Sequence, residues 1–173
     1  MGIKFLNQIL LIVTAGVILS VVWAVTVQAS NSDSPETSPG NFEQLRADLL
    51  LRLPDFAKFG KRQKNQVELL DKNDKVIGIM LLAPSGKYQR KEGFDGYINT
   101  AVLLDKNNKV AGVLLGKNNE TPRWIERLRK GGFLDRWNGK TPAEASSLEV
   151  DALTRATYSS EAIKHEVKVI TAQ

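Results

Sequence analysis

The sequence predicts an α+β domain in which hairpins build a twisted antiparallel sheet with helices packed on it. Two segments predict the sheet, because "LLDKNDKVIGIML" (69–81) and "LLDKNNKVAGVLL" (103–115) are near copies. Apolar residues at helical spacing before and after this pair predict the helices. A charge-free run over residues 9–27 predicts one transmembrane helix ahead of the domain.

The N-terminal run, "ILLIVTAGVILSVVWAVTV", would span roughly 28 Å as a helix, which is close to the thickness of a bilayer core. Lys4 precedes it and no acidic residue does, so we expect a cytoplasmic N-terminus and an exported domain. Residues 1–29 are therefore predicted to be an anchor. The alternative is a signal peptide cleaved after Ala29, although a typical signal core has only about 7–15 residues. The Ser- and Pro-rich residues 30–40 predict a flexible linker, and residues 41–173 the domain.

The domain is expected to begin with a helix over 41–54. Its apolar residues recur at helical spacing from Phe42 to Leu53, Asn41 suits an N-cap, and Pro54 ends it. Each repeat that follows has an Asp-Lys-Asn turn between apolar runs, which is typical of a β-hairpin. Gly78 and Gly112 occupy matching positions and indicate bulges or close backbone approaches.

Glycine-punctuated residues 86–98 are expected to form a loop between the hairpins. A helix should begin at Pro122 after Thr121 and end at Gly131. Residues 133–142, "FLDRWNGKTP", predict a loop anchored by its aromatic residues. The last helix is expected over about 159–170.

Composition narrows the classes of function. The formal net charge is +5 and the basic residues are spread along the chain, which favours an anionic ligand or anionic lipid over nucleic acid. The chain has no cysteine, so disulfides, thiolate metal sites and cysteine catalysis are excluded. His165 is the only histidine and is expected on a solvated face. We find no catalytic dyad, phosphate loop or metal-ligand motif in the sequence.

Hydroxyl side chains crowd the start of the last predicted helix, in "LTRATYSS" (153–160). One interpretation is N-capping and solvent exposure. The other is a phosphate site, because a helix N-terminus offers unpaired N–H groups and the positive end of a dipole.

Three segments, in order, resemble a known family. They are "GFDGYINTAVLLDKNNKVAGVLL", then "ETPRWIERL" with "FLDRWNGK", and "DALTRATYSS". Together they are similar to the FMN-binding domain of the G subunit of Rnf electron-transport complexes and of the C subunit of the sodium-pumping NADH:quinone reductase. The resemblance covers roughly residues 93–168, and the predicted anchor agrees with it.

The resemblance implies that a flavin transferase joins the FMN phosphate to Thr157, the last threonine of the family motif. Asp151, Thr154 and Ala156 fall on other positions of that motif; Asp151 would orient the attachment loop or bind the transferase's metal, or simply cap the loop. Arg155 stands where the family has glycine. An arginine there could pair with the phosphate or block the transferase.

The resemblance also places six residues beside the flavin: Gly93, Phe94, Gly96, Glu120, Thr121 and Trp124. Each has a structural alternative. The first three could form a plain turn, Glu120 and Thr121 could cap a helix, and Trp124 could pack in the core instead of stacking on the flavin ring.

The expected function is therefore that of a membrane-anchored flavoprotein on the extracytoplasmic side of a bacterial inner membrane. It would carry FMN and transfer electrons between the subunits of a membrane redox complex, rather than act as a stand-alone enzyme. One alternative is a structural or assembly subunit without flavin. A weaker one is a secreted sensory or lipid-surface domain.

Overall fold

A computed structural model describes residues 46–84 and 90–173 of the chain. The predicted anchor (1–29), the linker (30–40) and the expected N-cap Asn41 lie outside these ranges. Over the two described ranges, every helix is too short or too polar to cross a bilayer.

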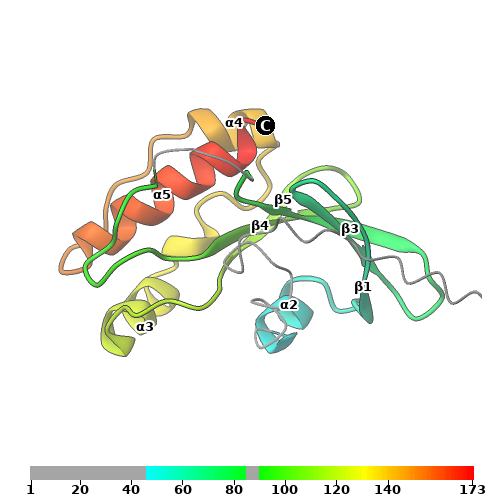
Figure 1. The fold of residues 1–173 in the computed structure, drawn as a ribbon, viewed down its shortest axis with the longest axis horizontal. Coiled ribbons are helices and arrows are strands. Elements are labelled where there is room, and N and C mark those ends of the chain that lie inside the picture. Colours follow the sequence, from blue (N-terminus) through cyan, green and yellow to red (C-terminus); the bar gives the residue numbers. More distant parts are fainter. Residues whose placement is uncertain (1–45, 85–89) are drawn as a thin grey trace, which may run out of the picture. The chain divides into compact units, whose positions relative to one another are not determined.

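The described elements confirm the α+β class and the antiparallel sheet. The five strands follow the order β1-β2-β3-β4-β5, so each strand pairs with its neighbour in sequence, and all pairs are antiparallel. Figure 1 shows the elements in chain order: α2 (Arg46–Arg52), β1 (Lys58–Gln63), β2 (Gln66–Leu70), β3 (Val76–Leu82), β4 (Thr100–Asp105), β5 (Val110–Leu115), α3 (Pro122–Lys130), the 3-10 helix η2 (Phe133–Asp135), α4 (Pro142–Ser147) and α5 (Thr157–Thr171).

The two sequence repeats form two hairpins with the same turn. In β2–β3, the Oδ1 atom of Asp71 accepts hydrogen bonds from the backbone N–H groups two and four residues later. Asp105 does the same in β4–β5. Asp74 and Asn108 both adopt positive φ, at 63° and 57°, as residue types that tolerate this conformation. Each turn is therefore stabilised by an aspartate whose carboxylate accepts two backbone hydrogen bonds.

The glycine shared by the repeats marks a register shift in each hairpin. A Cβ atom on Gly78 would collide with the carbonyl oxygen of Leu104 on the adjacent strand. A Cβ on Gly112 would lie 2.9 Å from Cδ of Arg52. Both expected roles of these glycines, a bulge and a close approach, thus occur together.

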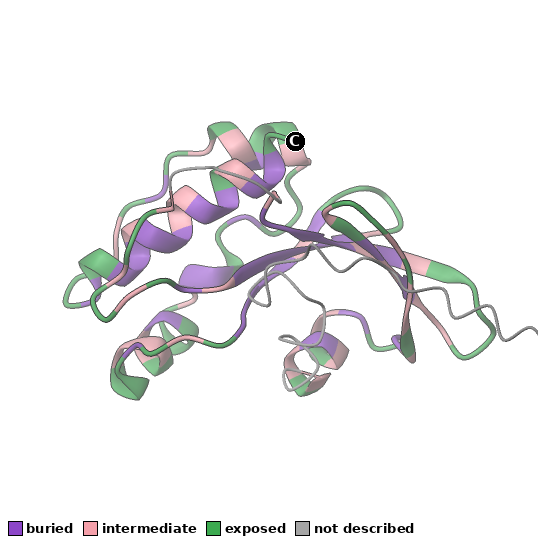
Figure 2. Cartoon of the chain, in the orientation of Figure 1, coloured by how far each residue is buried: buried purple, intermediate pink, exposed green. Residues whose placement is uncertain are grey.

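Apolar side chains cover both faces of the sheet. Helices α4 and α5 lie on one side and α2 on the other (Figure 1). Along β4, Val102 and Leu104 join the cluster that contains α5, whereas Ala101 and Leu103 join the cluster that contains α2. Strands β4 and β5 are consequently buried on both sides (Figure 2).

The helix expected from Pro122 to Gly131 is confirmed, and so is the aromatic anchor of the following loop. Phe133 and Trp137 are buried, with their ring centroids 5.5 Å apart in an edge-to-face arrangement. The last helix begins at Thr157, two residues earlier than expected. The sequence analysis did not predict β1 or α4.

Candidate functional site

A pocket of about 260 Å³ lies where three segments meet. The segments are the loop before β4, the first turn of α3 and the N-terminus of α5. The lining residues are Phe94, Trp124, Arg155, Ala156, Thr157, Tyr158 and Ser159. Five of the residues predicted from the sequence therefore share one pocket.

Glu120 joins the three segments behind this pocket. Its side chain is buried, and its Oε1 atom accepts a hydrogen bond of 2.9 Å from the backbone N–H of Asp95. Its Oε2 atom accepts a hydrogen bond of 2.6 Å from the hydroxyl of Ser159, which is also buried. The carboxylate thus holds the loop and α5 in fixed positions beside α3.

The loop before β4 needs both of its glycines. A Cβ on Gly93 would collide with Oε1 of Glu120. The Gly93 N–H donates a 2.8 Å hydrogen bond to the carbonyl of Gly96, whose φ of +103° disfavours any side chain. The tight turn exposes Phe94 at the pocket, with 65% of its surface accessible.

The first turn of α5 offers hydrogen-bond donors. Its N-cap residue is Ala156, which has no side-chain oxygen to cap the helix. Within the described part of the chain, the N–H groups of Thr157, Tyr158 and Ser159 donate to no acceptor. Three such donors at the positive end of a 15-residue helix favour an anion.

Ser160 fixes the backbone that leads into this turn. Its hydroxyl donates to the carbonyl of Ala156 at 2.7 Å and accepts from the N–H of Leu153 at 3.0 Å. Arg155 has a φ of +68° in the same turn, a conformation that glycine adopts more easily. The exposed Arg155 side chain lines the pocket next to the exposed Thr157.

Six predicted residues do not line the pocket: Gly93, Gly96 and Glu120, which support it as described above, and Asp151, Thr154 and Thr121. Asp151 and Thr154 are exposed on the segment before α5. Thr121 occupies the N-cap position of α3, but its side chain makes no capping hydrogen bond. Trp124 is half-buried and lines the pocket, so it is not a fully buried core residue, and stacking on a flavin ring stays a prediction.

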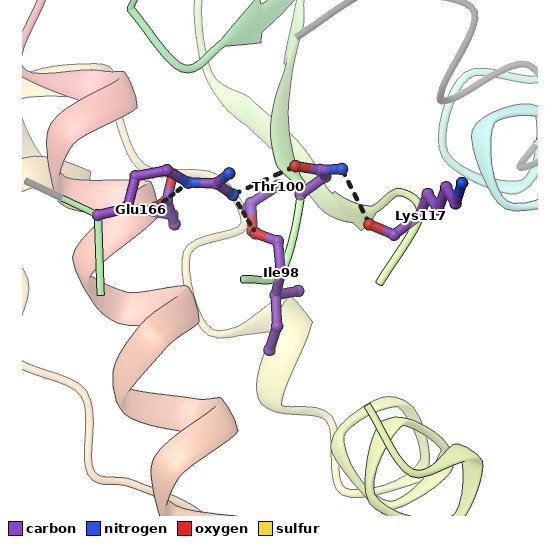
Figure 3. Close-up of polar contacts among 6 residues, drawn as sticks. Ile98, Thr100, Lys117 and Glu166 are labelled. Atoms are coloured by element: carbon purple, nitrogen blue, oxygen red, sulfur yellow. Dashed lines mark hydrogen bonds and ion pairs between the residues drawn. The ribbon is translucent and has the colours of Figure 1, made fainter. Parts of the chain in front are cut away.

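A polar network absent from the sequence analysis holds the loop against α5. Arg90 Nε lies 3.4 Å from Oε1 of the buried Glu166. Its guanidinium also donates hydrogen bonds to Oδ1 of Asn99, at 3.2 Å, and to the carbonyl of Ile98, at 3.4 Å. Asn99 then donates to the carbonyl of Lys117 at 2.9 Å, which extends the network to the segment after β5 (Figure 3).

A more exposed ion pair between the same loop and α5 adds to the Arg90–Glu166 pair. Lys91 Nζ lies 3.3 Å from Glu161 on α5, and Lys164 lies 2.9 Å from the same carboxylate. The hydrogen bond from Lys164 lowers the pKa of Glu161, and Lys91 adds to this against the effect of partial burial. No motif identifies Arg90 or Lys91, because each acts through a partner far away in sequence.

The pocket is open and small. Small-molecule sites commonly measure about 300–1,000 Å³, and this pocket is smaller. Phe94 and Tyr158, 65% and 68% exposed, stand at its mouth. A planar aromatic ligand would therefore keep part of its ring in solvent.

Residues 93–171 match the family model for the FMN-binding domain. The match begins at Gly93 and contains every residue that lines the pocket. Comparison with the curated proteins gave no match.

The site fits FMN in chemistry. The free N–H groups of α5 and the guanidinium of Arg155 suit a phosphate dianion. Phe94, Trp124 and Tyr158 supply aromatic surface for a flat ring.

Proposed function

Because residues 93–171 match the family model for the FMN-binding domain, we propose that the protein is a membrane-anchored electron carrier. In this proposal the pocket holds FMN, and the flavin exchanges electrons with the other subunits of a membrane redox complex. FMN supplies redox chemistry in one- or two-electron steps, and the protein positions the ring and tunes its potential.

The observation that carries the proposal is the first turn of α5. It combines the exposed hydroxyl of Thr157, at the first helical position, with N–H groups that lack an acceptor in the described structure. We propose that Thr157 Oγ forms a phosphoester bond with the FMN phosphate. The Oγ–P bond forms as the bond between the flavin phosphate and the leaving group of an activated donor breaks; with a flavin dinucleotide as donor, the leaving group is a nucleoside monophosphate. The hydroxyl proton passes to a base of the transferase and then to water, so the chain gains the mass of FMN less one water.

Arg155 supports phosphate binding in this proposal. Its φ of +68° is the conformation for which the glycine of the family pattern is suited, so the arginine fits the family's backbone. Its guanidinium can donate two parallel hydrogen bonds to phosphate oxygens. Thr157 is itself exposed beside this arginine, which supports access by a transferase.

The pocket's openness supports a carrier rather than an enzyme with its own substrate. A flavin ring whose edge stays at the surface can exchange electrons with a protein that docks there. The small pocket leaves little room for a second small molecule beside the ring.

The proposed location rests on residues 9–27, which would anchor the chain in the bacterial inner membrane with the domain outside the cytoplasm. A covalent bond has a clear advantage there, because it prevents the loss of FMN in a compartment that does not readily resupply it.

Intact-mass measurement of the full chain tests the covalent bond. The chain is produced in a host with the flavin transferase and then denatured. We expect a mass gain of one FMN less water and yellow colour that survives denaturation. Thr157→Ala should abolish both. Ser147→Ala is the control, because Ser147 is an exposed hydroxyl residue outside both the pocket and the attachment motif, and it should keep both.

The alternative function, a structural subunit without flavin, makes the opposite forecast. A chain with unmodified mass that also fails to bind added FMN would support it and would contradict the carrier. An unmodified chain that binds FMN reversibly would contradict only the covalent bond.

A further inference from the structure

A second, shallower hollow lies along α3 beside the pocket. It encloses about 440 Å³ and is lined by Arg123, Glu126, Arg127, Lys130, Gly131 and Leu153. We call it the α3 hollow. Nothing in the proposed flavin site uses its charged residues.

The α3 hollow carries a positive charge that the described structure does not neutralise. Glu126 and Lys130 pair with each other at 2.7 Å, and this hydrogen bond lowers the pKa of Glu126. Arg123 and Arg127 have no carboxylate within salt-bridge distance among the described residues. Arg129 on the same helix differs, because it pairs with Asp48 at 3.2 Å.

Trp124 connects the α3 hollow to the flavin pocket. The guanidinium of Arg123 lies 5.7 Å from the centroid of the Trp124 ring, and that of Arg127 lies 5.9 Å from it. The same Trp124 lines the pocket. A group bound at these two arginines would therefore lie next to the mouth through which the flavin is reached.

We propose that the α3 hollow is the docking site for an acidic surface on the protein that exchanges electrons with the flavin. This inference rests on the proposed function. Opposite charges at the docking site would steer the partner and orient its redox centre towards the pocket. Each reduced flavin would give two electrons, one to each of two one-electron partners, and release its protons to water.

Charge and shape favour a protein over a free anion. Arg123 is exposed and Arg127 half-buried, so a small ion would remain hydrated and bind weakly. A protein loop with two carboxylates could instead contact both arginines and also cover the half-buried Leu153.

The test compares two electron acceptors of opposite charge with the FMN-loaded full chain. Plastocyanin is a small acidic copper protein, and cytochrome c is a small basic haem protein. Flavin content is first established by absorbance, so a failure of the proposed function is seen separately. The flavin is then reduced by light with a sacrificial amine donor such as EDTA, and its oxidation is followed by anaerobic stopped-flow at several ionic strengths.

We expect the rate with plastocyanin to fall as salt rises. Arg123→Gln combined with Arg127→Gln should slow it about tenfold at low ionic strength. Lys72→Gln combined with Lys106→Gln removes the same charge from the exposed hairpin turns and should change the rate less than about twofold. With cytochrome c as the acceptor, the arginine variant should oxidise its flavin no more slowly than the wild-type chain.

A second measurement needs no flavin. Copper(I) plastocyanin, titrated with the flavin-free chain at low salt, should show NMR shift changes at its acidic residues that the arginine variant loses. Equal rates and equal shifts in the two double variants would overturn the proposal. Binding to vesicles with anionic lipid that the arginine variant alone loses, with plastocyanin rates unchanged, would overturn it in favour of a lipid surface.

Discussion

The hydroxyl of Ser159 donates a 2.6 Å hydrogen bond to the carboxylate of Glu120, and both side chains are buried. The bond joins α5 to the segment before α3, across 39 residues of sequence. It places the first turn of α5 and the aromatic residues of the pocket in one rigid arrangement.

Removal of this bond should destabilise the domain. A hydrogen bond to a buried charged group contributes about 1.5–3 kcal/mol, so Ser159→Ala should lower the free energy of unfolding by about 2 kcal/mol. Glu120→Gln should cost a similar amount. Urea unfolding measures both, and Glu149→Gln, at an exposed glutamate, is the control. Additive effects in the double variant would show that the two groups do not interact.

The two glycines of the loop before β4 should respond differently to alanine. Gly93→Ala forces a methyl group against Glu120 and should cost about 1–3 kcal/mol. A methyl at Gly96 meets no atom within 4 Å, so Gly96→Ala should cost only the backbone strain of about 1–2 kcal/mol. FMN affinity should fall more for Gly93→Ala, because that change also displaces the carboxylate. The reverse order would refute the close packing of Gly93 on Glu120.

The positive φ of Arg155 predicts opposite effects on stability for substitution by glycine and by valine. Arg155→Gly relieves strain but loosens the unfolded chain, so the free energy of unfolding should stay unchanged or rise by up to about 1 kcal/mol. Arg155→Val should lower it, because a β-branched side chain tolerates positive φ poorly. Thermal unfolding of both variants measures the effect. A clear loss of stability in Arg155→Gly would show that the side chain itself stabilises the fold.

The neighbouring residues Arg90 and Lys91 should contribute unequally to the free energy of unfolding. Arg90→Ala removes the guanidinium from the buried Glu166 and should cost about 3 kcal/mol, as breaking a buried pair does. Lys91→Ala breaks a more exposed pair and should cost less than about 1 kcal/mol. Urea unfolding of the two variants provides the comparison, with each serving as the other's control.

The capping box of α4 predicts that the stability of the domain depends on pH in the acidic range. Backbone and hydroxyl hydrogen bonds from Thr141 lower the pKa of Glu144 below its ordinary value of 4.5. Because the pKa is lower in the folded state, the stabilisation is present above that ordinary value and is lost as the pH falls through the folded pKa. Stability should therefore fall less on acidification in Glu144→Gln than in the wild-type chain. Equal slopes in urea titrations at several pH values would contradict this assignment.

Much of the sheet could be predicted from the sequence, because the repeat marks both hairpins and its aspartates specify their turns. Strand β1 was missed because "KFGKRQ" is mostly polar and exposed, and it lacks the apolar run of the other strands. Helix α4 was missed although Thr141, Pro142 and Glu144 form the pattern of a capped helix start. Its six residues are too few for apolar periodicity to reveal it.

The site was less accessible to sequence reasoning. The resemblance grouped the right segments, and the structure brings Gly93, Glu120 and Thr157 to one place. It could not show that Ser159 rather than Thr121 bonds to Glu120, because that choice depends on how α5 packs. The anchor over residues 9–27 and the covalent bond remain predictions.

The order of the strands has a consequence for how the domain folds. Every strand pairs with its sequence neighbour, so the sheet can grow through short chain closures at little entropic cost. The contacts of Glu120 instead close loops of 25 and 39 residues, and they need the sheet and α5 in place beforehand. The cofactor site should thus be completed late, and an apoprotein still maturing would present a formed sheet before it could accept a flavin.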